Sequence, residues 1–251
     1  MSFAAHTKIA ADEVPMSDVK SESISLMSTF RLILSDIARY RVTEKRSLPA
    51  ILIMSPGMIA GIYYRIGAWI WRYEGTLAPL IFLLRPFYIV GKRMLEVYSG
   101  ISLSPQARIG KGFYINHFGS IFIGAVIIGE NCNVSHEVTM GVAGRGSSKG
   151  LPTIGNRVYI APGTKIIGKV EVGDDVAIGA NSVVTKSIPD CAVVGGAPAK
   201  VISYRGSFDF ILYDTMDSDP QRLANMEHSL RETSNSRAHT KHTSSAPSKV
   251  S

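Results

Sequence analysis

Aliphatic residues recur every six positions along the middle of the chain, and this period constrains the fold more than any other feature. A period of six matches neither the turn of an α-helix, about 3.6 residues, nor the two-residue alternation of a flat strand. It fits a chain that turns a corner after every sixth residue. The clearest run is Ile154, Ile160, Ile166, Val172, Ile178 and Val184, and an earlier run with a one-residue slip is Leu103, Ile109, Ile115, Ile121, Ile128, Val134 and Met140.

Three such edges close one triangular coil of about 18 residues, whose aliphatic side chains point inward. A second residue, usually small, follows four positions later and fits near the corner, as Val158, Thr164 and Ser182 do. Each coil buries its apolar side only against its neighbours, so many coils are needed. Because the hits share one register, a sandwich of irregular strands is disfavoured. The sequence predicts a mainly β protein built on a parallel β-helix.

The rest of the chain divides around this repeat. Residues 1–22 are polar and aperiodic and are expected to be disordered. Residues 23–99 have the apolar spacing of several amphipathic helices, and 100–204 hold the β-helix. A glycine-rich basic loop, residues 142–152, adds eight residues to one six-residue edge, which suggests either a binding lid or a simple surface insertion. Residues 205–251 are expected to form a largely disordered extension.

The net charge of +7 is concentrated in the helical region. Between Arg31 and Glu96 the sequence has ten Lys/Arg and four Asp/Glu. No aromatic–basic interleaving or nucleic-acid motif accompanies this charge, so we expect no nucleic-acid partner. Packing between subunits accounts for a basic, apolar region most simply, and peripheral contact with a membrane surface is the alternative. The uncharged stretch 47–64 contains two prolines, Pro49 and Pro56, and is not expected to span a membrane.

The two cysteines do not form a disulfide framework. Cys132 falls on an inward position of the repeat and Cys191 lies beyond the last regular coil, so both are expected to be reduced and inert. The N-terminus has no signal-peptide pattern. Together these features predict a cytoplasmic protein.

Two of the six histidines, His117 and His136, lie inside the repeat. Each follows an inward aliphatic residue by two positions, so each is expected to point outward from a corner. They are 19 residues apart, one coil plus the slipped residue, and should stack on the same corner about 5 Å apart.

A histidine there can act as a general base, since its pKa ordinarily lies near neutrality. A lone surface histidine is more often merely solvated, but two on one corner favour a site. Two histidines are too few for a three-histidine zinc site, so no metal is expected.

On the next two coils the same corner carries Pro162 and Ala180, which are small or flat and would leave a groove beside the histidines. An extended ligand could lie there with its acyl end at His117. Its phosphates would then lie near basic residues, for which the candidates are Lys186, Lys200, Arg145 and Lys149. A pantetheine arm has this shape.

The repeat, the segment Ile115–Gly119, the loop 141–152 and the ending Val193–Lys200 resemble the bacterial hexapeptide-repeat acyltransferases. Within them the chain looks closest to serine O-acetyltransferases and to a related branch in polysaccharide biosynthesis. The resemblance implies a left-handed β-helix, a homotrimer, and acetyl-CoA bound between subunits. It implies that His117 is the catalytic base, and we expect His136 either to assist it or to shape the acceptor pocket. The cofactor-binding positions it implies are Ala161, Gly163, Ala180, Lys186 and Lys200, beside the loop's Arg145.

The sequence also departs from that pattern. Serine acetyltransferases have an aspartate 15 residues before the histidine, where this chain has Ser102, and a second histidine where it has Leu151. A glutamate is lost in the shortened stretch 124–126. Without these groups the charges of serine would be poorly paired. We therefore expect an acetyl-CoA-dependent O-acetyltransferase acting on a sugar of exopolysaccharide or lipopolysaccharide synthesis. Serine acetylation is the alternative, and a non-catalytic scaffold comes last.

Overall fold

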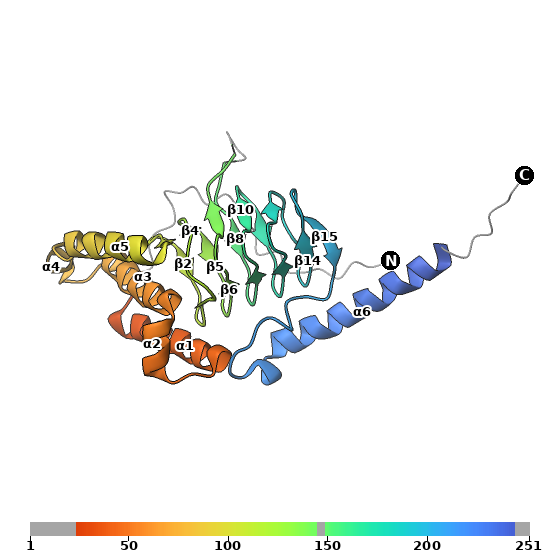
Figure 1. The fold of residues 1–251 in the computed structure, drawn as a ribbon, viewed down its shortest axis with the longest axis horizontal. Coiled ribbons are helices and arrows are strands. Elements are labelled where there is room, and N and C mark those ends of the chain that lie inside the picture. Colours follow the sequence, from red (N-terminus) through yellow and green to blue (C-terminus); the bar gives the residue numbers. More distant parts are fainter. Residues whose placement is uncertain (1–23, 145–148, 244–251) are drawn as a thin grey trace, which may run out of the picture.

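Three sheets wind around a common axis to form the body of the molecule, and helices pack against one end (Figure 1). The computed structural model describes residues 24–144 and 149–243, with side chains as far as residue 231. We call the sheets the first (β1-β4-β7-β10-β13), the second (β11-β8-β5-β2) and the third (β15-β14-β12-β9-β6-β3). From β1 to β13, every third strand belongs to the same sheet, as a three-edged coil requires. The predicted fold, a left-handed parallel β-helix preceded by helices, is confirmed.

The strands contain two to four residues each, and all of them pair in parallel except β15, which pairs antiparallel with β14. Their bounds are β1 (Ile101–Leu103), β2 (Arg108–Ile109), β3 (Tyr114–Ile115), β4 (Ile121–Ile123), β5 (Ile127–Ile128), β6 (Asn133–Val134), β7 (Thr139–Gly141), β8 (Thr153–Ile154), β9 (Tyr159–Ile160), β10 (Lys165–Ile167), β11 (Glu171–Val172), β12 (Ala177–Ile178), β13 (Val183–Val184), β14 (Val193–Gly195) and β15 (Lys200–Ser203).

The aliphatic residues of the repeat are buried inside the prism, with only 0–6% of their surface exposed. The slip in the repeat has a different form from the one expected. Leu103 pairs with Ile123 rather than with Ile121, which pairs with Ile101 instead. The first edge after Ile115 is therefore two residues too long, and the next edge, which ends at Ile128, is one residue too short. Spacing alone cannot show this, because Ile121 and Ile123 both point inward.

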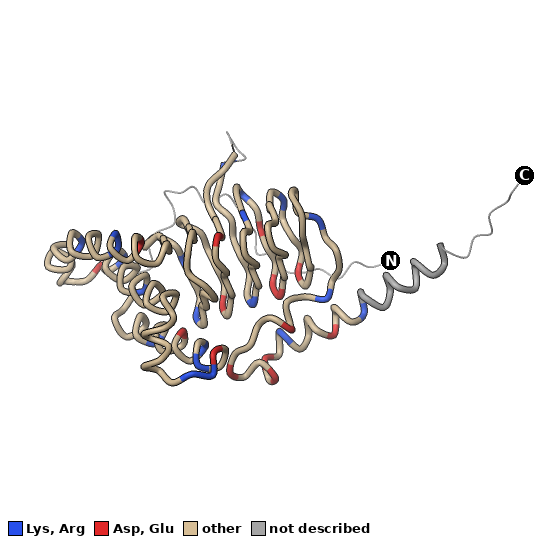
Figure 2. The backbone as a smooth tube through the Cα atoms, viewed as in Figure 1, with Lys and Arg blue, Asp and Glu red and all other residues tan. Residues whose placement is uncertain are grey.

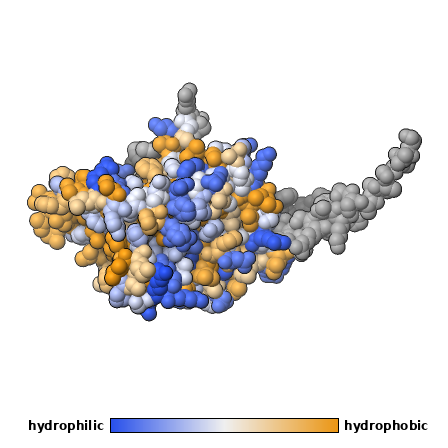
Figure 3. Space-filling view, in the orientation of Figure 1, coloured by the Kyte–Doolittle hydropathy of each residue, from blue (hydrophilic) through white to orange (hydrophobic). Residues whose placement is uncertain are grey.

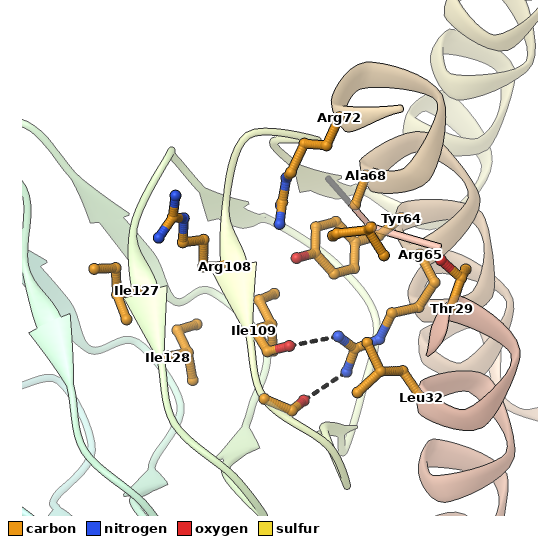
Figure 4. Close-up of a pocket in the computed structure, with 12 residues that line it drawn as sticks. Thr29, Leu32, Tyr64, Arg65, Ala68, Arg72, Arg108, Ile109, Ile127 and Ile128 are labelled. Carbon is orange, nitrogen blue, oxygen red and sulfur yellow. Dashed lines mark hydrogen bonds between the residues drawn. The ribbon is translucent and has the colours of Figure 1, made fainter. Parts of the chain in front are cut away.

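The helices at the end of the prism are α1 (Leu26–Glu44), α2 (Leu48–Met54), α3 (Pro56–Arg72), α4 (Ala78–Phe82) and α5 (Arg85–Ser99). A buried ion pair joins α1 to α3, with Arg65 Nε 2.9 Å from Asp36 Oδ2. Arg65 also donates to the carbonyls of Ile109 and Gly110, the contacts dashed in Figure 4, while Asp36 accepts from the amide of Phe113. Burial raises the pKa of Asp36, and the charge and hydrogen bonds of Arg65 oppose that shift. This pair fixes the helices to the first coil.

No single described helix is long and apolar enough to cross a membrane. Helices α2 and α3 pass that test only as a pair, and they are bent by 91° at the break between them.

The C-terminal extension differs from the expectation of disorder over 205–251, because Pro220–Thr243 forms a helix, α6. Asp219 Oδ1 accepts from the amides of Gln221 and Arg222, as an N-cap does. The segment before α6 is fixed to the third sheet, where Phe210 stacks on Tyr159 at 4.6 Å. The early part of α6 is rich in good helix formers, and this outweighs its shortage of apolar residues.

Both cysteines are free and buried. Burial raises the pKa of each thiol to about 12, so neither forms thiolate near neutral pH.

Adjacent isoleucines on β5 offer a test of the inward column. Ile128 is 2% exposed inside the prism, and Ile127, 45% exposed, points outward. Ile128→Ala should lower the free energy of unfolding by about 2–5 kcal/mol, because it leaves a cavity that the coil cannot close. Ile127→Ala should change it by less than about 1 kcal/mol. Urea unfolding followed by circular dichroism measures both, and similar losses in the two variants would contradict the assigned register.

Candidate functional site

One corner of the prism carries both repeat histidines. Ile115, Val134, Ile160 and Ile178 are in register across the third sheet. The residues two positions later therefore stack at the corner between the third and first sheets. The centroids of the first two rings are 5.7 Å apart, with the ring planes at 68°, so the predicted stacking is confirmed. We call this row the histidine ridge, and it consists of His117, His136, Pro162 and Ala180.

The two extra residues of the first coil lie at the corner occupied by His117. Its backbone turns through left-handed conformations at Gly119 (φ 104°) and Ser120 (φ 54°) before entering β4. His117 is exposed there. His136 is half-buried, and its Nδ1 is buried with no hydrogen-bond partner among the described residues. The His117 imidazole is thus open to solvent, while His136 Nδ1 has no hydrogen-bond partner among the described residues.

The small residues predicted to line a groove follow the histidines along the ridge. Ala161 is buried and donates its amide to the carbonyl of Ile178 at 3.0 Å, whereas Ala180 is exposed. Gly163 has a φ of 76°, and a Cβ there would lie 2.0 Å from Asn181 Oδ1. Its amide donates to the carbonyl of His136 at 3.1 Å. A side chain at Gly163 would have to displace that of Asn181, and the ridge beyond His136 carries no bulky side chain.

The predicted basic residues divide between two corners of one chain. Lys200 pairs with Gly195 and lies at the end of the histidine ridge. Lys186 follows β13 and therefore lies at the corner between the first and second sheets. The loop leaves that same corner between β7 and β8, and Ala143 and Gly150 bridge its base. Arg145 lies outside the described residues. A single chain therefore does not bring Lys186 and the loop to the histidines.

A carboxylate that sequence reasoning missed lies next to Ser102. Ser102 Oγ donates to Glu96 Oε1 at 2.6 Å, and Lys92 also donates to that oxygen. Burial disfavours the charged Glu96, but the hydrogen bonds and charges of these neighbours outweigh it and lower its pKa. Glu96 comes from α5, and no sequence pattern links it to Ser102.

Two charged residues border the ridge on the first sheet. Glu137 follows His136 and is exposed, with a φ of 60°. Lys165 opens β10, and its ammonium donates to the carbonyl of Glu137. The Lys165 ammonium is thus held at the backbone of the residue that follows His136. Among the described residues, no three His, Cys, Asp or Glu side chains gather where they could hold a metal ion.

The chain is similar in sequence to known transferases. Residues 152–186 match the family model described as bacterial transferase hexapeptide (six repeats). A serine acetyltransferase of Mycobacterium tuberculosis is 33% identical over 200 residues, which cover 76% of this chain and 83% of that protein. A serine acetyltransferase of Helicobacter pylori is 34% identical over 61% of this chain and 85% of its own length.

Solved structures give the same result. A serine acetyltransferase in complex with CoA has a TM-score of 0.60 at 26% identity, covering 70% of this chain and 71% of that one. A soybean serine acetyltransferase complexed with serine has a TM-score of 0.61 at 26% identity, covering 70% of both chains. The expectation of a sugar acceptor is therefore wrong, because these relatives are named for serine. The substitutions at Ser102 and Leu151 do not exclude serine, and a carboxylate is present beside Ser102, since Glu96 lies 2.6 Å from its hydroxyl.

Proposed function

Because the chain belongs to the serine acetyltransferase family of hexapeptide-repeat acyltransferases, we propose that it transfers the acetyl group of acetyl-CoA to the hydroxyl of serine. The observation that carries this proposal is the similarity to named serine acetyltransferases, which at 200 residues is far longer than the β-helix alone. The exposed imidazole of His117 on the ridge supplies the chemistry that such a transfer needs.

In this proposal His117 is the general base. Its imidazole accepts the proton of the serine hydroxyl as the oxygen attacks the thioester carbonyl. The tetrahedral intermediate then collapses, the carbon–sulfur bond breaks, and the thiolate takes up the proton held by the imidazolium. His136, 5.7 Å away between ring centroids, shapes the acceptor pocket or assists this transfer. The small residues Ala161, Gly163 and Ala180 leave a flat surface for a narrow pantetheine chain.

Serine needs one anion and one cation near the base, because it carries an ammonium and a carboxylate. We assign these roles to Glu137 and Lys165, because Glu137 directly follows His136 and the Lys165 ammonium donates to the backbone carbonyl of Glu137. A zwitterion bound between them has both charges paired, which removes the cost of burying either charge alone.

We also propose a homotrimer. The outer face of the third sheet is covered by α1 and by the segment before α6, through the Tyr40–Tyr114 and Tyr159–Phe210 contacts. The first and second sheets keep apolar side chains exposed, among them Phe122 and Ile127. Packing these faces between copies would bring the loop and Lys186 of one copy to the histidine ridge of another. The phosphates of acetyl-CoA would then meet basic residues of two subunits.

His117→Ala should lower turnover by at least about a hundredfold, because the hydroxyl loses its base. The measurement is thiol release from acetyl-CoA in the presence of serine. His228→Ala, on the exposed side of α6, is the control and should retain full rate. An unchanged rate in His117→Ala would contradict the assignment of His117 as the general base. Acetyl-CoA binding without any serine-dependent thiol release would sink the choice of serine.

Lys165→Met should raise the KM for serine by about tenfold while leaving the KM for acetyl-CoA within about twofold, because only the serine carboxylate loses its partner. Lys111→Met is the matched control, since that lysine pairs with Glu130 away from the ridge. Equal changes in both KM values would contradict the assignment of Lys165 to the acceptor.

Ala180→Trp should weaken acetyl-CoA binding by more than about tenfold, because a large ring would fill the flat end of the ridge. Isothermal calorimetry with CoA measures this effect. Ala224→Trp, exposed on α6, is the control. CoA binding of normal strength in Ala180→Trp would place the pantetheine groove elsewhere.

A further inference from the structure

The end of the molecule farthest from the C-terminal end of α6 is covered by exposed apolar side chains (Figures 1 and 3). They come from α4, α5 and the turn before each helix. We call them the α4–α5 patch, and its members are Leu77, Leu80, Phe82, Leu83, Leu84, Phe87, Ile89, Val90, Met94, Val97 and Tyr98. The most exposed among them are Phe87 (77%), Met94 (70%) and Val97 (88%). Apolar patches of this extent on a folded protein mark an interaction surface.

Helix α5 packs one side against the rest of the molecule and exposes large apolar side chains on another. Tyr88 and Ser99 are buried on its inner side, and Tyr88 packs against α3 through the rings of Tyr63 and Trp71. The outer side carries Phe87, Val90, Met94 and Val97, which recur every three or four residues and so share one face. A helix face made of large apolar side chains is ordinarily covered in a folded protein. The outer face of α5 therefore lacks the cover that its composition calls for.

Positive charge accompanies the patch. Between Leu77 and Gly100 the sequence contains Arg85, Lys92 and Arg93 but one acid, Glu96. Lys92 and Arg93 both contact the Glu96 carboxylate, and this small cluster keeps a net positive charge. The Arg85 guanidinium lies over the rings of Trp71 and Phe82, at 5.2 and 4.9 Å from their centroids. Figure 2 shows basic positions on the helices at this end, together with a few acidic ones.

This charge decides between two occupants. A second copy of the chain would bring an equally positive patch, so that like charges would face each other across an apolar contact. The headgroups of anionic phospholipids carry the complementary charge, and their acyl chains accept Leu, Phe and Val side chains. We propose that the α4–α5 patch docks on a membrane surface that contains anionic lipid. The histidine ridge lies on the prism, so docking through this end of the molecule leaves it accessible.

The test is flotation of the full-length protein with extruded vesicles of phosphatidylcholine, alone or with about 30% phosphatidylglycerol. The protein should float with the anionic vesicles, and raising the salt to about 0.5 M should reduce binding severalfold. The double variant Phe87→Glu/Met94→Glu should bind at least about tenfold more weakly, because it loses two apolar contacts and gains two negative charges. Ile202→Glu, at an equally exposed position on β15, should bind like the natural chain.

Thermal unfolding followed by circular dichroism should give the same midpoint for both variants, which would show that the loss is not one of folding. Failure of the natural chain to float with anionic vesicles would overturn the proposal. So would equal binding by the double variant. Sedimentation showing that the double variant abolishes self-association, with no vesicle binding by either protein, would assign the patch to a second copy instead.

Discussion

The column of aliphatic side chains inside the prism is the constraint on which the rest depends. Each strand has two to four residues, too few to be stable alone, and is held by parallel pairing above and below and by the buried residue that it sends inward. Because the inward residues must stack, the positions two residues later must stack as well. The histidine ridge is therefore a consequence of core packing. Its rings lie together because Ile115 and Val134 do.

The buried pair of Asp36 and Arg65 extends this constraint to the helices. Burying two charges is costly, and the cost is met here because both groups also bind backbone atoms of the first coils, at Ile109, Gly110 and Phe113. Removing either partner would leave the other buried and unpaired, a loss of about 3–5 kcal/mol. The helical end is thus fixed to the prism, and α5 presents its outer face in a defined orientation.

The sequence predicts the repeat, the helical region and the shared corner of His117 and His136, because each follows from a period that packing enforces. It places the slip wrongly, since Ile121 and Ile123 are both aliphatic and only the pairing with Leu103 separates them. It also cannot show that Lys186 and the loop lie one corner away from the histidines. A spacing of six residues tells how far along the coil a residue lies. The corner on which that residue lies becomes known only when the eight-residue insertion and the two irregular edges have been located.

The acceptor was misjudged for a related reason. Ser102 in place of an aspartate suggests a lost negative charge when positions are compared one by one along the chain. In space, a carboxylate lies 2.6 Å from that hydroxyl, because Glu96 reaches it from a helix. Glu137 follows His136 in the chain, and the Lys165 ammonium binds the backbone carbonyl of Glu137, at positions where no motif points to them. The charge around an active centre depends on which side chains lie near it in space, and any helix, strand or loop that reaches the centre can supply such a side chain. Replacing one residue therefore does not by itself exclude a zwitterionic acceptor, and here it did not outweigh the similarity over the greater part of the chain.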